Sequence, residues 1–135
     1  MTTYNWMALA DKKTISFAPV SDVFRFDDPS ISAASVTVTL VNATSVTFAY
    51  GGKTVTLLVD VRSLTTSNLT FADSSLLIFG DNSLGGLNDD GDNTISGSGR
   101  ADQIFGLGGV DSIQGGSRAS VLNGGDGDDY IIGGS

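Results

Sequence analysis

The sequence contains no cysteine, no histidine and no glutamate. The absence of cysteine rules out disulfides and thiol chemistry. The absence of histidine rules out a Ser-His-Asp triad and the zinc-binding helix of metalloproteases. Zinc would also find neither of its two commonest ligands in this chain. We therefore expect a protein that is not an enzyme.

Because glutamate is missing, all fifteen acidic residues are aspartates, and the formal net charge is −8. Nine of these aspartates, against two arginines, lie from Gly80 onward. Short carboxylates of this kind are typical of turns that bind an ion rather than of the charged surface of a helix. The acidic balance also predicts repulsion from nucleic acid and from anionic membrane surfaces.

Long apolar runs are missing as well. The N-terminus, MTTYNWMALADKK, is too polar for a signal peptide, and no stretch approaches the length of a transmembrane helix. The sequence therefore predicts no insertion into a membrane.

What the sequence does contain is a phrase of nine residues, repeated from Asn88 to Ile132 as NDDGDNTIS, GSGRADQIF, GLGGVDSIQ, GGSRASVLN and GGDGDDYII. The eighth place is always aliphatic: Ile95, Ile104, Ile113, Leu122 and Ile131. The sixth place holds Asn93, Asp102, Asp111, Ser120 and Asp129. A flexible acidic linker has no reason to keep this period, so each unit is interpreted as a turn of about six residues and a strand of about three.

One aliphatic residue per unit cannot build a core alone, so the units must stack as a solenoid. We expect two units per coil, with alternate turns on opposite edges. The acidic edge would align Asp89, Asp90, Asp92, Asp111, Asp126, Asp128 and Asp129. The opposite edge, here called the arginine edge, would align Asp102 with Ser120 and Arg100 with Arg118.

Seven carboxylates on one edge repel one another unless a cation lies between them. Calcium is the best match, because it accepts six to eight oxygens in flexible geometry and combines carboxylates with the carbonyls of glycine turns. An imperfect further copy, GDNSL, precedes the five repeats, and we expect its turn to lie on the arginine edge facing Asp102. The predicted ligands are Gly80, Asp81, Asn82, Asp89, Asp90, Gly91, Asp92, Asn93, Asp102, Gly108, Gly109, Asp111, Gly125, Asp126, Gly127, Asp128 and Asp129.

The phrase resembles the repeats-in-toxin (RTX) nonapeptide, G-G-x-G-x-D-x-U-x with U a large aliphatic residue. The match is best in GGDGDDYII and GLGGVDSIQ. The resemblance implies a parallel β-roll that binds calcium between successive turns, in a bacterial protein that leaves the cell by type I secretion. It suggests a secreted or cell-surface structural or interaction protein, such as an adhesin, a surface-layer component or a filament subunit. The alternatives are an accessory part of a larger secreted hydrolase or epimerase, or a calcium-dependent secretion and folding module.

Arg100 and Arg118 occupy the fourth place, where the family has glycine, and Ser120 replaces the aspartate of the sixth place. We expect the arginines to pair with Asp102 and so replace a calcium in part. The alternative is that they point into solvent.

We expect residues 1–79 to form a small antiparallel β unit, which is a sandwich or half-barrel, and residues 80–135 to form the roll. A short helical turn is expected at 6–10, and strands are expected at 14–18, 22–26, 35–41, 45–50, 53–61, 68–71 and 76–79. The last strand would pass its edge to the solenoid. Asp27 and Asp28 are interpreted as an acidic turn before Pro29.

The sequence reaches residue 135 inside the repeat pattern, so we expect a longer product or a trimmed one. Either a longer tail covers the exposed end around Tyr130, Ile131 and Ile132, or another copy binds there head to tail; the alternative is a chain that stays monomeric. Tyr4, Trp6 and Met7 are the predicted donors of apolar surface for that contact.

Overall fold

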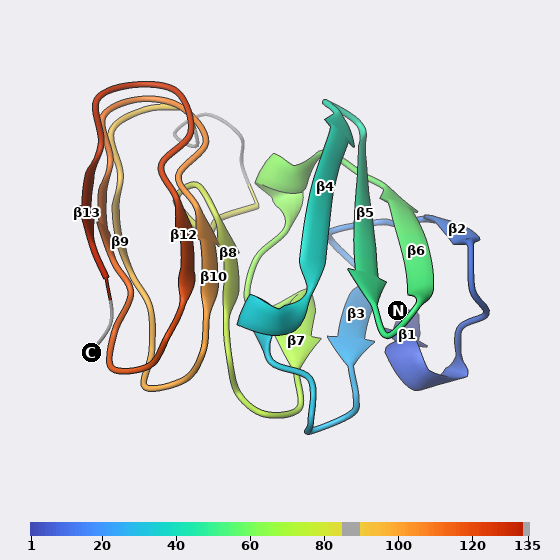
Figure 1. Cartoon of the computed structure of the whole chain (residues 1–135). Coiled ribbons are helices and arrows are strands. Elements are labelled where there is room, and N and C mark those ends of the chain that lie inside the picture. The colour runs from blue at the N-terminus through green and yellow to red at the C-terminus, as the bar shows by residue number, and fades with distance from the viewer. Residues whose placement is uncertain (85–89, 134–135) are drawn as a thin grey trace.

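The computed structural model describes residues 1–84 and 90–133, and over these residues the chain is all-β, as predicted (Figure 1). The strands are β1 (Thr3–Asn5), β2 (Lys13–Ser16), β3 (Val23–Phe26), β4 (Thr37–Asn42), β5 (Ser45–Tyr50), β6 (Lys53–Leu58), β7 (Leu69–Phe71), β8 (Leu77–Phe79), β9 (Thr94–Ser96), β10 (Gln103–Phe105), β11 (Ser112–Gln114), β12 (Val121–Asn123) and β13 (Tyr130–Ile132). Short 3-10 turns are η1 (Trp6–Ala8), η2 (Ala33–Ser35) and η3 (Val61–Ser63). None of the helices in this part of the chain has the length and apolarity that a membrane crossing requires.

The repeats form a flattened coil with two parallel sheets, ordered β8-β10-β12 and β9-β11-β13. Ile113 pairs in register with Ile95 on one side and with Ile131 on the other. Ile104 pairs in the same way with Ile78 and Leu122. Alternate units therefore stack directly over one another, and the prediction of two nonapeptides per coil is confirmed.

The interior of the roll is a column of aliphatic side chains from both sheets. Ile78, Ile95, Ile104 and Ile113 are buried in one cluster, and Leu122 packs against it. Ile131 belongs to the same column but keeps 44% of its surface exposed. The repeats thus bury their apolar positions only where a neighbouring coil covers them, as expected of a solenoid.

In the N-terminal part, β4, β5 and β6 form the predicted antiparallel meander. The antiparallel arrangement does not extend further, because β2 runs parallel to β6, and β1, β3 and β7 form a parallel sheet. Alternation of apolar and polar residues indicates a strand but carries no information on its direction. The chain therefore already winds as a coil before the repeats begin, and the β4–β5 hairpin is inserted between β3 and β6 (Figure 1).

Aromatic side chains fill the core of the N-terminal part. Phe26 stacks on Phe71 with centroids 4.5 Å apart, and its other contacts include Trp6 at 4.9 Å. Trp6 is only 2% exposed, because η1 turns it inward against β3. Trp6 is therefore a core residue and is not available as a donor of apolar surface for another chain.

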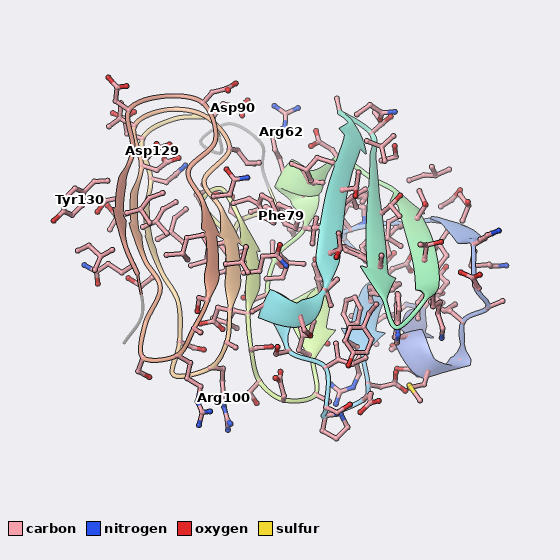
Figure 2. The ribbon with its side chains drawn as sticks, viewed as in Figure 1. Arg62, Phe79, Asp90, Arg100, Asp129 and Tyr130 are labelled. Atoms are coloured by element: carbon pink, nitrogen blue, oxygen red, sulfur yellow. The ribbon has the colours of Figure 1, made fainter. Side chains whose placement is uncertain are left out.

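The first strands of the roll also contribute side chains to the N-terminal core, which is separate from the cluster inside the roll. On β8, Leu77 and Phe79 face away from the roll interior and belong to the N-terminal cluster, as does Phe105 on β10. The rings of Phe79 and Phe105 stack with centroids 5.3 Å apart. Figure 2 shows Phe79 between the roll and the N-terminal sheets. β8 also pairs with β10, so the expectation that this strand passes its edge to the solenoid is confirmed. The domain boundary at residues 79 and 80 stays a prediction.

Candidate metal-binding edge

The two edges of the roll lie at opposite ends of its short strands. Residues 106–111 connect β10 to β11 and residues 124–129 connect β12 to β13 on the acidic edge, where residues 90–93 also lead into β9. Residues 97–102 and 115–120 form the arginine edge. Figure 2 shows Asp90 and Asp129 toward one end of the roll and Arg100 at the other. The predicted division of charge between the edges is therefore present in the structure.

From the second repeat on, the side chain at the sixth place binds the coil before it. Asp111 Oδ1 accepts a hydrogen bond from the backbone N–H of Asn93 at 2.8 Å. Asp129 Oδ1 accepts one from the N–H of Asp111 at 2.9 Å. The carboxylates at this place thus use one oxygen to join successive coils, which leaves the second oxygen for another partner.

Asp111 lies between the other two acidic turns, and the residue is 1% exposed. Its Oδ2 is buried, and no hydrogen-bond donor within the described residues reaches it. Burial raises the pKa of this carboxyl, and the negative charges of Asp129 and Asp92 raise the pKa further. A buried carboxylate oxygen without a donor costs free energy unless a cation or a proton neutralises it.

Glycines bring carbonyl oxygens to this carboxylate. A Cβ at Gly106 would collide with both Asp111 Oδ2 and the carbonyl oxygen of Gly124, so these two oxygens converge on the same space. Gly109 has φ +97°, and a Cβ there would strike the carbonyl group of Gly91 in the coil before. The glycines of the motif are required because the turns stack backbone on backbone and place carbonyl oxygens next to the carboxylates.

On the arginine edge, the protein itself satisfies the carboxylate of Asp102. Asp102 Oδ1 accepts a hydrogen bond from the N–H of Leu76 at 2.8 Å. The hydroxyl of Ser98 donates to the same carboxylate at 2.9 and 3.0 Å, and the Ser98 N–H donates to Oδ2. Both oxygens of Asp102 therefore have donors, unlike those of Asp111.

Ser120 takes the place of the aspartate in the next coil of this edge. Its hydroxyl accepts a hydrogen bond from the Asp102 N–H at 3.1 Å and donates to the carbonyl of Gly115 at 3.1 Å. A hydroxyl can make both bonds without leaving a charge. The serine therefore preserves the link between coils while removing a negative charge.

The predicted pairing of Arg100 and Arg118 with Asp102 is not seen. Asp102 is completely buried and bonded as described, and neither arginine has an ion pair within residues 1–84 and 90–133. Arg100 points away from the roll in Figure 2. Hydrogen bonds from Ser98 and from the Leu76 N–H satisfy the Asp102 carboxylate instead, and the repeat pattern does not distinguish Ser98 from the other small residues of the turns.

The expected position of Gly80, Asp81 and Asn82 was also wrong. They follow β8 as residues 106–108 follow β10, and the Gly80 N–H donates to the Phe105 carbonyl at 2.8 Å. They therefore lie on the acidic side of the roll, and the turn that faces Asp102 is the one ending at Leu76. Asp81 accepts hydrogen bonds from Ser83, while Asn82 bonds Thr66 of the N-terminal part. GDNSL therefore begins the connection from β8 to β9 and does not form a turn of the arginine edge.

The remaining predicted ligands fall into two groups. Gly91, Asp92, Gly108, Gly125, Asp126, Gly127 and Asp128 lie in the stacked turns of the acidic edge, while Asp89 is outside the described residues. Gly108 and Asp126 form a parallel bridge between coils. Among the described residues, no group of three or more carboxylates converges closely enough to form a metal site by itself.

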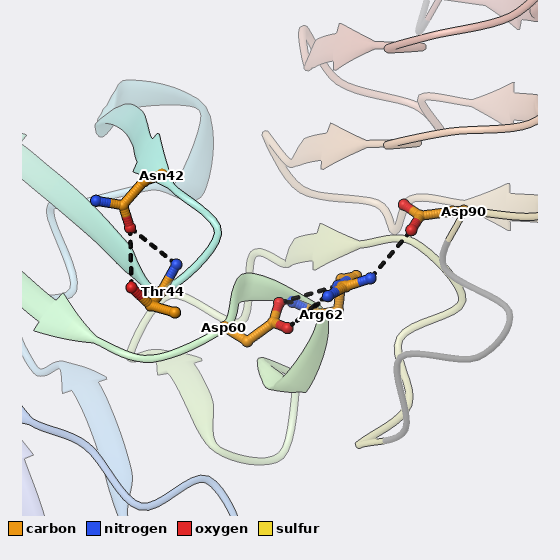
Figure 3. A network of polar contacts seen from close by, with 5 residues as sticks. All are labelled: Asn42, Thr44, Asp60, Arg62 and Asp90. Atoms are coloured by element: carbon orange, nitrogen blue, oxygen red, sulfur yellow. Dashed lines mark hydrogen bonds and ion pairs between the residues drawn. The ribbon is translucent and has the colours of Figure 1, made fainter.

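Asp90 has a partner that the sequence did not reveal. Arg62 of η3 donates from Nη1 to Asp90 Oδ2 at 3.0 Å and from Nη2 to Asp60 Oδ2 at 2.8 Å (Figure 3). Asp60 is two residues from Arg62, but Asp90 is 28 residues away, so no local pattern could have shown this contact. A cationic side chain of the N-terminal part thus reaches the acidic edge.

Stacked glycine turns, inward-facing aliphatic residues and rows of carboxylates beside backbone carbonyls define a parallel β-roll with one acidic edge. The family described as the RTX calcium-binding nonapeptide repeat (4 copies) matches residues 87–117 and 106–135. Residues 87–135 of this chain therefore match the RTX nonapeptide repeat. The comparison with curated proteins finds no match. The comparison with solved structures finds none either.

Proposed function

We propose that this protein binds calcium along the acidic edge of its roll and that binding orders the repeats. The observation that carries the proposal is the buried Asp111 Oδ2, which has no donor among the described residues and lies beside the Gly124 carbonyl. Asp92, Asp111 and Asp129 would each contribute carboxylate oxygens to calcium ions along this edge, and carbonyl oxygens of the glycine turns would complete the coordination. Bound calcium would supply the positive charge that these stacked carboxylates need.

The test compares circular dichroism of the full chain in EGTA and in millimolar calcium, with magnesium as the matched control ion. We expect the β signal to rise with calcium and to respond much less to magnesium, which demands a tighter octahedron. An unchanged spectrum between EGTA and calcium would contradict the proposal.

For the biological setting, we propose a secreted or cell-surface protein with a structural or interaction role rather than a catalytic one. Sites that combine few carboxylates with backbone carbonyls suit the high calcium levels outside cells. Adhesin, surface-layer and filament roles share this requirement. Calcium titration of the full chain checks it: a dissociation constant in the micromolar range or below would instead suit a calcium signal inside the cell.

We further propose that the last coil contacts a second copy. Tyr130, Ile131 and Ile132 on β13 are 65%, 44% and 43% exposed, and β13 is the outermost strand of its sheet. With Trp6 buried, Met7 at 59% exposure remains a donor of apolar surface from the N-terminal part. Light scattering in calcium should show species larger than a monomer, and Ile132→Asp should reduce them. A monomer at all concentrations would contradict this contact.

A further inference from the structure

The first coil of the roll is fastened to the N-terminal part by polar contacts as well as by its aromatic rings. Gln103 at the start of β10 is 4% exposed, and its Nε2 donates to the carbonyls of Ala33 and Val36 at 2.7 and 2.8 Å. The Ala34 N–H donates to the carbonyl of Ala101 at 3.1 Å. These bonds connect η2 to the strand and to the turn that precedes it, and none of them involves a cation site.

In the same coil, Asp102 requires no cation, because Ser98 and Leu76 donate hydrogen bonds to its carboxylate. On the acidic side, Arg62 brings a guanidinium to Asp90. Asp90 is about 60% exposed, so this pair contributes less than the buried contacts of Gln103 and Phe105. Its importance is that the protein supplies a fixed cation at the start of the acidic edge.

The later coils lack such support. On β12, Val121 stands in the same column as Gln103 but is 44% exposed and does not belong to the N-terminal core. On β13, Tyr130 is 65% exposed. Between them lies Asp111, with its buried oxygen that no described donor reaches. Within the described residues, the protein alone therefore supplies the contacts that hold β8 and β10, whereas the turn at Asp111 leaves a buried oxygen without a donor.

We propose that β8 and β10 fold together with the N-terminal part in the absence of calcium and form a template on which calcium orders β11, β12 and β13. Solenoid coils are stabilised by their neighbours, so starting a new array is costly while extending an existing one is not. A preformed coil with open edges removes the starting cost and sets the register for the next strand. This proposal rests on the proposed calcium function and concerns where ordering begins.

Amide hydrogen exchange by NMR on the full chain tests it at residue resolution. The reporters are the Gln103 N–H, which donates to the Leu76 carbonyl at 2.9 Å, and the Tyr130 N–H, which donates to the Asp111 carbonyl at 2.7 Å. In EGTA we expect the Gln103 amide to exchange at least ~100-fold more slowly than an unfolded amide, and the Tyr130 amide within about tenfold of the unfolded rate. In calcium both amides should be protected.

Two results would overturn the proposal in different ways. If the Gln103 amide is unprotected in EGTA and gains protection together with Tyr130 in calcium, the template is wrong while the calcium function stands. If the Tyr130 amide is fully protected in EGTA, calcium does not order the roll, and the proposed function fails together with the template.

Substitutions locate the template in the contacts described. Gln103→Ala removes both bonds to η2 and should speed exchange across β10 in EGTA by about tenfold, the effect expected for a loss of ~1.4 kcal/mol. The matched control is Gln114→Ala, because Gln114 is exposed on β11. The control should leave β10 unchanged in EGTA. Equal effects of the two substitutions on β10, or no effect of Gln103→Ala, would contradict the role assigned to Gln103.

Discussion

Asp102 and Asp111 occupy the same place in consecutive repeats, yet both oxygens of Asp102 accept hydrogen bonds while Asp111 Oδ2 has no donor within the described residues. The difference arises from the residue four positions before Asp102, where Ser98 supplies a hydroxyl and a well-aimed N–H. One motif therefore produces a carboxylate whose two oxygens are satisfied by hydrogen bonds and a carboxylate with one oxygen that no described donor reaches.

Asp111→Asn and Asp102→Asn should therefore differ in their effect on calcium affinity. The asparagine keeps an acceptor for the N–H of the coil before but removes the charge. We expect Asp111→Asn to weaken calcium binding at least about tenfold, or ~1.4 kcal/mol, and Asp102→Asn to leave the affinity within about twofold. Isothermal titration calorimetry measures both. Equal losses would mean that the two edges bind calcium alike.

Ser98→Ala tests whether the hydrogen bonds of Ser98 take the place of a cation at Asp102 on the arginine edge. Removal of the hydroxyl deletes bonds to a buried carboxylate and should lower the free energy of unfolding by roughly 1–3 kcal/mol. Because no ion is involved, the loss should be the same in EGTA and in calcium, as measured by urea denaturation of the template region. Ser117→Ala, at an exposed serine of the same edge, is the control and should change stability by less than ~0.5 kcal/mol.

The pKa of Asp111 predicts how the calcium-free roll responds to acid. Its folded pKa is raised above the ordinary value of 3.8, so the folded state takes up a proton more readily than the unfolded state. The resulting penalty is present in full above the folded pKa and disappears as pH falls through it toward 3.8. In EGTA the later coils should thus gain stability on mild acidification. Asp111→Asn should abolish this gain in circular dichroism titrations, and a gain that persists in the variant would assign it to another group.

The glycine stack predicts a sharp contrast between two substitutions. Gly109→Ala places a Cβ against the Gly91 carbonyl at a backbone angle of φ +97° and should prevent the coils from stacking. Gly99→Ala meets only Ser117 Oγ at 3.5 Å, an ordinary contact. We expect the first variant to lose the calcium-induced β signal and the second to keep it. A normal calcium response in Gly109→Ala would show that the turns relax more than their packing suggests.

The sequence predicted most of the roll because its physics is local. A single aliphatic residue per repeat, with glycine in the turns, allows few arrangements other than stacked coils, and the pairing of Ile95 with Ile113 follows from the period alone. Strand direction in the N-terminal part could not be predicted, because β2 and β6 form a parallel pair although 36 residues separate them in the sequence. The contacts of Arg62 and Gln103 were equally inaccessible, because each depends on how two distant segments meet.

Because consecutive strands alternate between the two sheets, only the addition of an even number of repeats keeps every turn on its own edge. Insertion of a single nonapeptide would move every later turn to the opposite edge. A turn that carries arginine would then stack on a turn of the acidic edge. Insertion of two nonapeptides would preserve both edges and add one coil. Duplication within such a gene is therefore expected to be tolerated in pairs of repeats, and the odd repeat would be tolerated only at an end of the array.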